Sequence, residues 1–525
     1  MQTREWDAVV VGGGTAGLSA AQMLGRARRR TLVLDEGHPR NRFAAHMHGV
    51  LGHDGLPPDE LLARGRHEAA AYGVAVEVAS VIAVEDLGER LRVIRADGSA
   101  ELARTLIVTT GLTDALPAVE GLTQRWGIDV LHCPYCHGWE VAGARLGVLA
   151  TSSASLHQIE LVRQWSDDVI AFTALAEPLD AEVAARLHAR GIRTVSAAVV
   201  SVESDGDGLR AAITVDGDRH PLDALFVAPD PVIDLGFVEA LALVRSDLPG
   251  GPLAVDERGA TSHPRVFAAG NVVAPYANVP VSMGTGSMAG AGAGAALVTE
   301  DAARALATAR ADAARRDAWE ERYSSDEHVW SGRVNATLAA VVGDLPADGT
   351  ALDIGCGEGG DAIWLAERGW RVTGLDLSET AVRRASAAAR ERGLDDGRAS
   401  FVAGDAASAS GETVLGEATF DLVTTSFLHS WEADFPRIAL LRAAADRVAP
   451  GGRLLVLSHA AAPPWASAHS DHVPELRGPA EELALLDLDP ARWEVEIVEV
   501  RPRETLDPDG DPARLEDGVL LLRRR

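Results

Sequence analysis

The sequence predicts an α/β protein in which strands alternate with helices in two separate units. The first observation is a buried strand pattern at 7–14 (DAVVVGGG), which leads into a glycine turn, a helix and a second strand at 31–34. The second is another glycine-rich turn, which follows a strand pattern at 351–354. The third is an Ala-rich, charged stretch with a helical pattern at 299–323, where we expect the joint between the units. Further strands of the second unit are expected at 371–375, 399–402, 420–424 and 453–458.

Composition limits the functions that the chain can have. Its 525 residues suffice for about three or four domains of ~150 residues. All 49 basic residues are arginine, so a lysine Schiff base and a Walker-type phosphate loop are both excluded. An Ala-, Arg- and Gly-rich composition explains the missing lysine more simply than selection against amines does. The net charge of −28 argues against binding to nucleic acid and to an anionic membrane surface.

Two segments of the sequence bear on where in the cell the protein is located. The first residues (MQTREWDAVVVGGG) enter a strand almost at once, which leaves no room for a signal peptide, so we expect a cytoplasmic protein. The uncharged run at 281–298 (VSMGTGSMAGAGAGAALV) approaches the length of a membrane span. Because it is rich in Gly, Ala and Ser, we expect a buried helix and no membrane association.

Gly12, Gly14 and Gly17 form a GxGxxG pattern where the first strand meets the first helix. Glycines there let backbone amides approach a pyrophosphate, whose charge the helix N-terminus favours. Asp35 ends the next strand and can accept a hydrogen bond from a ribose hydroxyl. The pattern alone indicates a dinucleotide site, with a structural tight turn as the alternative.

Two of the three cysteines, Cys133 and Cys136, form a CxxC pair. This spacing is typical of a redox dithiol or of half a zinc site. His132 and His137 flank the pair and could complete a metal site, but no second pair of suitable ligands is apparent, and we predict no metal. A helix start lowers a thiol pKa and makes the thiolate a nucleophile at neutral pH. His137 is then a candidate general base, with capping or packing as its alternative role.

Residues 1–300 resemble the low-molecular-weight thioredoxin reductase family of flavoproteins. The resemblance rests on VVVGGGTAGLSAA, on TTGLTDALP at 109–117, on CPYC at 133–136 and on VFAAGNV at 266–272. It implies a Rossmann-like FAD-binding domain split into residues 1–118 and 244–300 by an inserted NAD(P)-type domain at 119–243. The residues that would hold FAD are Gly12, Gly14, Gly17, Asp35, Gly111, Gly270 and Asn271. Asn271 stands where the family usually has Asp; it can still bond a ribityl hydroxyl but carries no charge.

The same resemblance implies roles for the cysteine pair. Electrons would pass between the flavin and a CxxC disulfide, with Cys136 facing the flavin and Cys133 exchanging with substrate. The variant CPYCHGWE looks more like the small-molecule dithiol oxidases, which close disulfides in compounds of the gliotoxin and holomycin type. Histidines in the loop AAHMHGVLGHDG (His46, His48, His53) have a substrate role or loop packing as alternatives.

The inserted domain departs from the family at its nucleotide-binding positions. Ala150, Ser152 and Ser155 stand where a GxGxxG/A fingerprint is expected, so side chains occupy the place where backbone must meet pyrophosphate. The family's paired arginines for a 2′-phosphate should follow the next strand, but residues 169–178 (VIAFTALAEP) contain none. The domain therefore looks degenerate, and the use of NADPH is doubtful.

Asp353, Gly355, Gly357 and Gly359 match the DxGxGxG pattern of class I methyltransferases that use S-adenosylmethionine. The resemblance, closest to enzymes of the tellurite-resistance and thiopurine type, implies a Rossmann-like methyltransferase domain at 331–525 after a helical linker at 301–330. Asp376 would bind the ribose hydroxyls and Asp405 the adenine amino group. A Rossmann relic that binds nothing is the alternative. Candidate residues of the acceptor pocket are Trp330, Arg333, His429 and Trp431, and the late cluster of His459, His469, Asp471 and His472 is only weak evidence for metal.

We therefore expect a bifunctional enzyme. One half would oxidise a small dithiol with oxygen through FAD, and the other would transfer a methyl group to a small molecule, with a thiol as one candidate acceptor. The alternatives are an NADPH-dependent thioredoxin reductase-like enzyme with a fused methyltransferase, and a flavin redox sensor that controls the methyltransferase. The expected partners are small thiols or dithiols, and the resemblance leaves a homodimer open.

Overall fold

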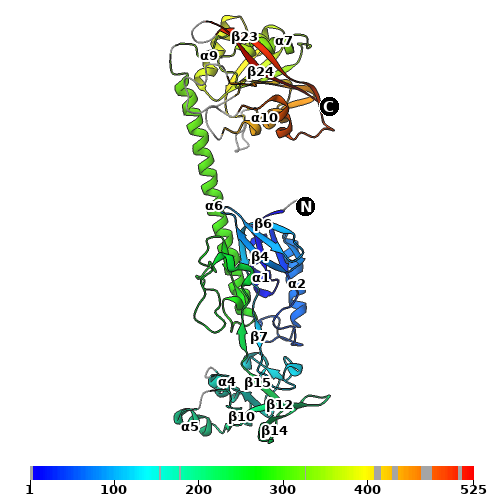
Figure 1. Ribbon diagram of the computed structural model, residues 1–525, viewed down its shortest axis with the longest axis vertical. Helices are drawn as coiled ribbons and strands as arrows, with labels where there is room; N and C mark the ends of the chain where they lie inside the picture. Colours follow the sequence, from blue (N-terminus) through cyan, green and yellow to red (C-terminus); the bar gives the residue numbers. More distant parts are fainter. Residues whose placement is uncertain are drawn as a thin grey trace. The chain divides into compact units, whose positions relative to one another are not determined.

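The computed structural model describes residues 4–152, 155–176, 179–325, 327–406, 415–428, 435–462, 476–506 and 511–525. The chain divides into two compact units, Met1–Ala303 and Arg304–Arg525, and each is described by itself. In Figure 1 the first unit runs from blue to green and the second from green to red. Within the described ranges, no helix combines the length and apolar composition that a membrane span requires.

The first unit begins with a seven-stranded sheet in the order β3-β2-β1-β6-β5-β4, to which β17 is added beside β6. Strands β1, β2, β3, β6 and β17 are parallel, whereas β4 and β5 are antiparallel. The unbroken apolar run of β1 is buried on both faces, which is typical of a central parallel strand. The strands are β1 (Arg4–Val11), β2 (Thr31–Asp35), β3 (Ala75–Val78), β4 (Val81–Asp86), β5 (Leu91–Arg95), β6 (Ala100–Val108) and β17 (Val266–Ala268).

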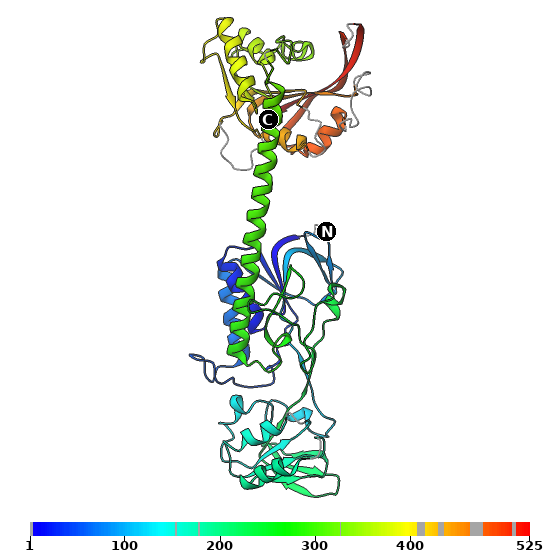
Figure 2. The same cartoon turned by 90° about the vertical axis from the view of Figure 1, so that its left-hand side faces the viewer.

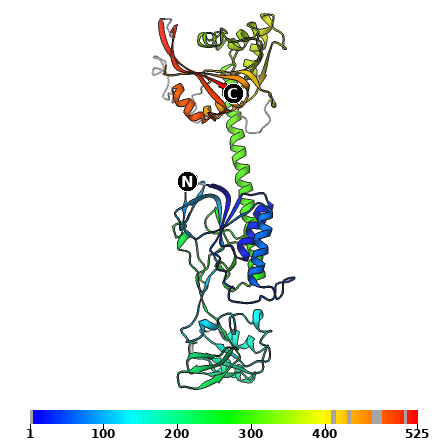
Figure 3. The same cartoon turned by 90° about the vertical axis from the view of Figure 1, so that its right-hand side faces the viewer.

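Three helices pack beside this sheet: α1 (Thr15–Arg26), α2 (Pro58–Ala71) and α6 (Val279–Arg322). Figures 2 and 3 show α1 and α2, in blue, alongside the amino-terminal part of α6, in green. Glycine allows this approach, because a Cβ at Gly286 would lie 2.1 Å from the carbonyl oxygen of Ala16. The two helical stretches expected at 281–298 and 299–323 form one continuous helix of 44 residues.

A second sheet, β11-β10-β9-β15-β8, forms the core of the inserted segment, coloured cyan to teal in Figure 1. The chain enters through β7 (Thr113–Ala115) and returns through β16 (Asp230–Val232), and these two strands pair antiparallel. The sheet strands are β8 (Val130–Leu131), β9 (Leu146–Leu149), β10 (Val169–Phe172), β11 (Arg193–Val195) and β15 (Ala224–Val227). The remaining elements are β12 (Val199–Ser204), β13 (Leu209–Thr214), β14 (Arg219–Pro221), α3 (Pro134–His137), α4 (Ser155–Val162) and α5 (Ala181–Ala189), with short 3₁₀ turns at Thr123–Arg125, Gly236–Leu241 and Gly270–Val272.

The second unit has a seven-stranded sheet in the order β20-β19-β18-β21-β22-β24-β23, parallel except for β24. Because β18, β19 and β20 are parallel neighbours, the loops that follow them meet at one edge of the sheet. The strands are β18 (Thr350–Ile354), β19 (Arg371–Asp376), β20 (Ala399–Ala403), β21 (Phe420–Ser426), β22 (Val448–His459), β23 (Trp493–Leu506) and β24 (Pro512–Arg524). The helices are α7 (Ala336–Val342), α8 (Gly360–Glu367), α9 (Glu379–Glu391), α10 (Arg437–Asp446) and α11 (Pro479–Leu486).

Candidate active sites

The first glycine turn forms a tight backbone cradle between β1 and α1. Gly12 has φ of +101°, and a Cβ there would lie 2.4 Å from the carbonyl oxygen of Thr109. A Cβ at Gly17 would lie 1.9 Å from the carbonyl oxygen of Gly12, whereas Gly14 at the N-cap faces open space. The Gly13 amide donates to Oδ1 of Asp35 at 3.0 Å, which fixes that carboxylate at the end of β2. The cradle therefore leaves the N-terminus of α1 accessible to an anionic group.

The opposite wall of the same site comes from the segment before α6. Gly270, with φ of +77°, packs against Ala16 of α1, and its amide donates to the hydroxyl of Thr285 at 3.2 Å. The Asn271 amide group donates to three loop carbonyls at 2.9–3.2 Å, so the side chain presents its oxygen as the remaining acceptor. Arg40 in the neighbouring loop pairs with Asp114 at 2.6 Å and donates to the carbonyl of Pro275.

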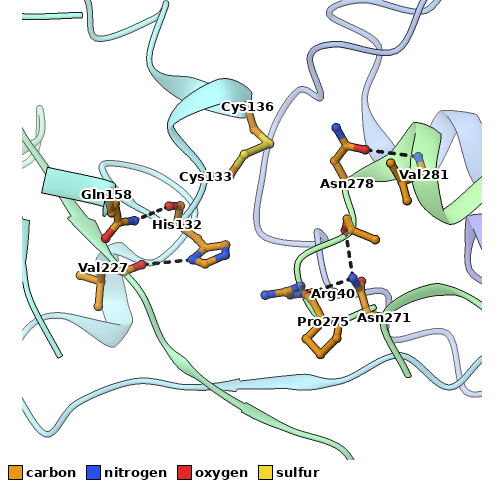
Figure 4. Close-up of a disulfide and its surroundings, with 11 residues drawn as sticks. Arg40, His132, Cys133, Cys136, Gln158, Val227, Asn271, Pro275, Asn278 and Val281 are labelled. Carbon is orange, nitrogen blue, oxygen red and sulfur yellow. Dashed lines mark hydrogen bonds between the residues drawn. A yellow bond between two sulfur atoms is a disulfide. The ribbon is translucent and has the colours of Figure 1, made fainter. Parts of the chain in front are cut away.

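A cavity of about 800 Å³ joins this cradle to the cysteine pair. Its volume falls within the range of about 300–1,000 Å³ that is usual for ligand pockets. Cys133 and Cys136 form a disulfide at the start of the short helix α3, and Figure 4 shows it across from Arg40 and from the segment that carries Asn271 and Asn278. Predicted residues on the cavity wall are Gly12, Gly14, Asp35, Gly111, Gly270, Asn271, Cys133, Cys136 and His137.

Three histidines, His48, His132 and His137, line the same cavity as the disulfide. His137 lies on the cavity wall, and burial lowers the pKa of its imidazole below the ordinary value, against the opposing effect of the Glu140 carboxylate. His48 places Nε2 3.4 Å from Glu140 and Nδ1 3.5 Å from Asp54. His132 turns Nδ1 to the carbonyl of Val227 at 3.2 Å, and burial lowers its pKa as well. Both imidazoles next to the CxxC pair therefore favour the neutral form.

In the inserted domain, two backbone amides after β9 are hydrogen-bonded by a side chain of the following helix. The Ser155 hydroxyl is fully buried and accepts from the amide of Thr151 at 3.1 Å and from that of Ser152 at 3.4 Å. These two amides follow β9, where backbone donors would otherwise face a pyrophosphate. Residues 173–176, the described stretch directly after β10, contain no arginine.

In the second unit, the glycine loop after β18 lies against Asp376. The Asp376 carboxylate accepts from the amides of Gly357 at 2.8 Å and Ser378 at 3.0 Å. Gly355, Gly357 and Gly359 all have positive φ, between 52° and 86°, which glycine adopts without strain. The loop and the carboxylate thus form one connected edge above β18 and β19.

Buried carboxylates lie beneath this loop. Asp353, at the end of β18, is 2% exposed and accepts from the Thr424 hydroxyl at 2.8 Å. Burial, followed by the nearby Asp361 carboxylate, raises the pKa of Asp353 well above its usual range. Asp405 follows β20 and pairs with Arg315 at 3.4 Å. A cationic ligand near Asp353 would favour the ionised form of this carboxyl.

The other predicted residues of this unit have different surroundings. Trp330 donates its indole N–H to the Tyr323 hydroxyl at 2.8 Å, and both side chains lie against Gly357. The carbonyl of Arg333 lies beside Gly360. His459 stacks on Phe427 with ring centroids 4.5 Å apart. His429, Trp431, His469, Asp471 and His472 lie outside the described residues, and within the described ranges no group of His, Cys, Asp or Glu is arranged to hold a metal.

Several residues of these sites were missed from the sequence. The capping role of Ser155 was not anticipated from its place in the altered fingerprint, Tyr323 belongs to no motif, and Arg315 pairs with a residue far along the chain. The CxxC neighbour Glu140 was within the quoted CHGWE segment, but its pairing with His48 has no sequence signal.

Comparison with known proteins agrees with this division of the chain. Residues 6–290, more than half of the chain, match the pyridine nucleotide-disulphide oxidoreductase family, and residues 351–452 match a methyltransferase domain. A thioredoxin reductase of Leptosphaeria maculans, sirT, is 30% identical over 308 residues, which cover 55% of this chain and 93% of that protein. A probable thioredoxin reductase of Arthroderma benhamiae is 34% identical over 174 residues, but the match spans only 43% of its length and 32% of this chain.

A solved structure gives the same result. The crystal structure of a protein named HlmI is 41% identical with a TM-score of 0.56, covering 58% of this chain and 96% of HlmI. The predicted fold class is thereby confirmed: a thioredoxin reductase-like fold of FAD/NAD type is followed by a methyltransferase domain. The chain is an enzyme that belongs to the pyridine nucleotide-disulphide oxidoreductase family through a thioredoxin reductase-like region, to which a methyltransferase domain is fused.

Proposed function

We propose that the first unit is an FAD-dependent oxidase of small dithiols and that the second transfers a methyl group from S-adenosylmethionine to a small molecule. The observation that carries the first part is the cavity of about 800 Å³, which joins a dinucleotide cradle to a disulfide. The domains would be residues 1–118 and 244–300 for FAD, 119–243 for the inserted domain, a linker at 301–330 and 331–525 for methyl transfer.

The cradle supports FAD as the resident cofactor. Gly12, Gly14 and Gly17 allow a pyrophosphate to approach the N-terminus of α1, and Asp35 is held in place to accept from a ribose hydroxyl. Asn271 would offer its oxygen, and Gly111 and Gly270 would line the flavin side. A bound FAD would supply two-electron redox chemistry between the reduced cysteine pair and oxygen.

The cysteines and His137 would carry out the thiol exchange. His137, neutral because of its burial, would take the proton of one substrate thiol. The resulting thiolate would attack Cys133 Sγ, which forms a mixed disulfide and releases Cys136 as a thiolate. The second substrate thiol would then attack its own mixed-disulfide sulfur, closing the substrate disulfide and leaving both enzyme cysteines reduced.

The capped amides after β9 support oxygen over NADPH as the reaction partner. Ser155 already satisfies the donors of Thr151 and Ser152, and the sequence carries no arginine at 169–178 to pair with a 2′-phosphate. Anaerobic stopped-flow reduction of the purified protein tests this. A small dithiol should bleach the flavin absorbance rapidly, and NADPH should not; rapid bleaching by micromolar NADPH would refute the proposal.

The names of the relatives favour a second candidate for the same site. Several matching proteins are thioredoxin reductases, so an enzyme that reduces thioredoxin with an electron donor is the alternative. Reduction of thioredoxin by the purified protein, with NADPH as the donor, would favour it.

The scarcity of cysteine and the exchange chemistry both suit a reducing cytoplasm.

The second unit would bind S-adenosylmethionine at the edge formed by the loops after β18, β19 and β20. Gly355, Gly357 and Gly359 would allow backbone contact with the amino-acid part, and Asp353 would lie beneath it. Asp376 would bind the ribose hydroxyls and Asp405 the adenine amino group. Transfer of label from S-adenosylmethionine to a small thiol tests the activity, and the absence of transfer to any thiol offered would remove the thiol as acceptor.

A further inference from the structure

The carboxyl-terminal end of α6 lies over the loops that are proposed to bind the methyl donor. Arg315 reaches Asp405 after β20, and Glu320 accepts from the amide of Thr380, just beyond β19. Tyr323 is 2% exposed and lies with its hydroxyl against Gly357 in the loop after β18. The stretch 315–323, counted in the sequence as linker, therefore contacts the loops after β18 and β20 and the first turn of α9, which follows β19.

The contact of Arg315 with Asp405 is almost sealed from solvent. Guanidinium Nη1 lies 3.4 Å from Asp405 Oδ2, and the two side chains are 11% and 10% exposed. The same Nη1 donates to Asp312 Oδ1 at 3.2 Å, one turn earlier in α6, which fixes the arginine from behind. The ion pair thereby holds the Asp405 carboxylate in one place against α6.

The hydrogen-bonding groups of the Asp405 side chain decide which base it can recognise. An ionised carboxylate only accepts hydrogen bonds, so it attracts the amino group at C6 of adenine. The same carboxylate repels the carbonyl oxygen that hypoxanthine carries at C6. If the carboxylate were not held facing C6, the preference between the two bases would be lost.

We propose that Arg315 is a positioning residue of the methyl-donor site, holding the carboxylate of Asp405 in place for recognition of adenine. The inference rests on the proposed binding of S-adenosylmethionine by the second unit. Glu320 and Tyr323 hold the same helix end against the other two loops, so α6 completes the donor site.

Calorimetric titration of the full-length protein tests this with two ligands, S-adenosylhomocysteine and its inosine analogue. The wild type should prefer the adenine ligand by about tenfold or more, the usual effect of one hydrogen bond to a charged group. Arg315→Ala should weaken binding of S-adenosylhomocysteine and bring the ratio between the ligands close to one. Arg310→Ala removes an exposed arginine of the same helix and should leave both affinities unchanged.

A second pair of variants separates positioning from packing. Arg315→Gln keeps most of the side-chain length but not the charge, and it should also lose the preference. In an Asp405→Asn background, Arg315→Ala should not change the ratio further, because Arg315 acts through that carboxylate. If Arg315→Ala weakens the binding of both ligands equally, or if Arg315→Gln keeps the wild-type ratio of affinities, the proposed role of Arg315 is overturned. Failure of the wild type to bind either ligand overturns the proposed donor site itself.

Discussion

His137 is the residue next to the disulfide whose protonation matters most for thiol exchange. Burial lowers the pKa of its imidazole, and the positive charge on His48 would lower it further, while Glu140 opposes both. The lowered pKa means that the ring stays neutral down to a pH below the ordinary histidine value of 6.5. It can therefore accept a proton from a substrate thiol at neutral pH.

We expect His137→Gln to lower kcat/KM for a small dithiol by roughly 100-fold or more, because general bases contribute on that scale. In the wild type, the rate should fall with acid only below pH 6.5, and the variant should lack this acid limb. Steady-state oxygen consumption across pH measures both. His188→Gln, on the exposed side of α5, is the control, and an unchanged pH profile in His137→Gln would remove the histidine from the mechanism.

The raised pKa of Asp353 leads to a separate prediction for the second unit. Because burial raises its pKa, the carboxyl is largely protonated in the free protein, and a cationic methyl donor nearby would favour its ionised form. Donor binding should therefore release protons, and affinity should rise from mildly acidic to mildly basic pH. Calorimetry in buffers of different ionisation enthalpy measures this release; Asp353→Asn should abolish it, and release that persists in the variant would assign the proton to another group.

At the scale of elements, the packing of α6 on α1 positions the flavin cradle. Gly286 and Gly290 bring the α6 backbone against the carbonyls of Ala16 and Ala20, where a Cβ would lie at 2.1 Å and 2.5 Å. Ala16 is also the residue that Gly270 contacts. A displaced α6 would therefore disturb both walls of the cavity.

Gly286→Ala should destabilise the first unit by about 1–3 kcal/mol, the usual cost of overpacking, and should lower the amount of FAD retained on purification. Gly284→Ala is the matched control, because its Cβ faces open space and alanine favours a helix by up to about 1 kcal/mol. Thermal unfolding and the flavin absorbance ratio measure the two effects. Equal FAD content and equal unfolding midpoints in both variants would contradict this packing role.

Much of the element pattern was predictable from local sequence. The strands expected at 351–354, 371–375 and 399–402 are found as β18, β19 and β20 within a residue or two, because unbroken apolar runs ended by glycine or acid are strong signals. The unbroken course of the helix through the joint expected at 299–323 was harder to predict. No breaker interrupts the sequence there, so one helix continues from the first unit into the second.

Individual side-chain contacts, both local and between distant segments, could not be predicted. The hydroxyl of Ser155 looked like a misplaced side chain in a glycine fingerprint, whereas in the structure it caps the amides of Thr151 and Ser152. Arg315 looked like one of many charges on an exposed linker helix, yet it is paired with Asp405, 90 residues further along the chain. Such pairings depend on tertiary packing, which periodicity and motif spacing do not encode.

At the scale of the whole molecule, two enzyme units share the single helix α6, which belongs to the first unit up to Ala303 and to the second from Arg304. Their proposed reactions use different residues and different cofactors. A disulfide in the first unit and a set of acids in the second are the groups whose loss should separate the two activities.

Cys136→Ser should abolish dithiol oxidation and leave methyl transfer at the wild-type rate. Asp376→Ala should do the reverse, since it removes the carboxylate that holds the Gly357 amide and, by the proposal, the donor ribose. Both activities are measured on each purified variant. A methyl transfer rate in the wild type that follows the redox state, and that Cys136→Ser makes constant, would instead indicate a redox sensor.

Oxygen uptake by the purified full-length protein with a small dithiol, in the presence and absence of NADPH, is the most direct test. We expect uptake that depends on the dithiol, yields one disulfide for each oxygen consumed, and is unaffected by NADPH. Uptake or thiol production that requires NADPH, with no consumption of the dithiol, would contradict the proposed oxidase and identify a reductase.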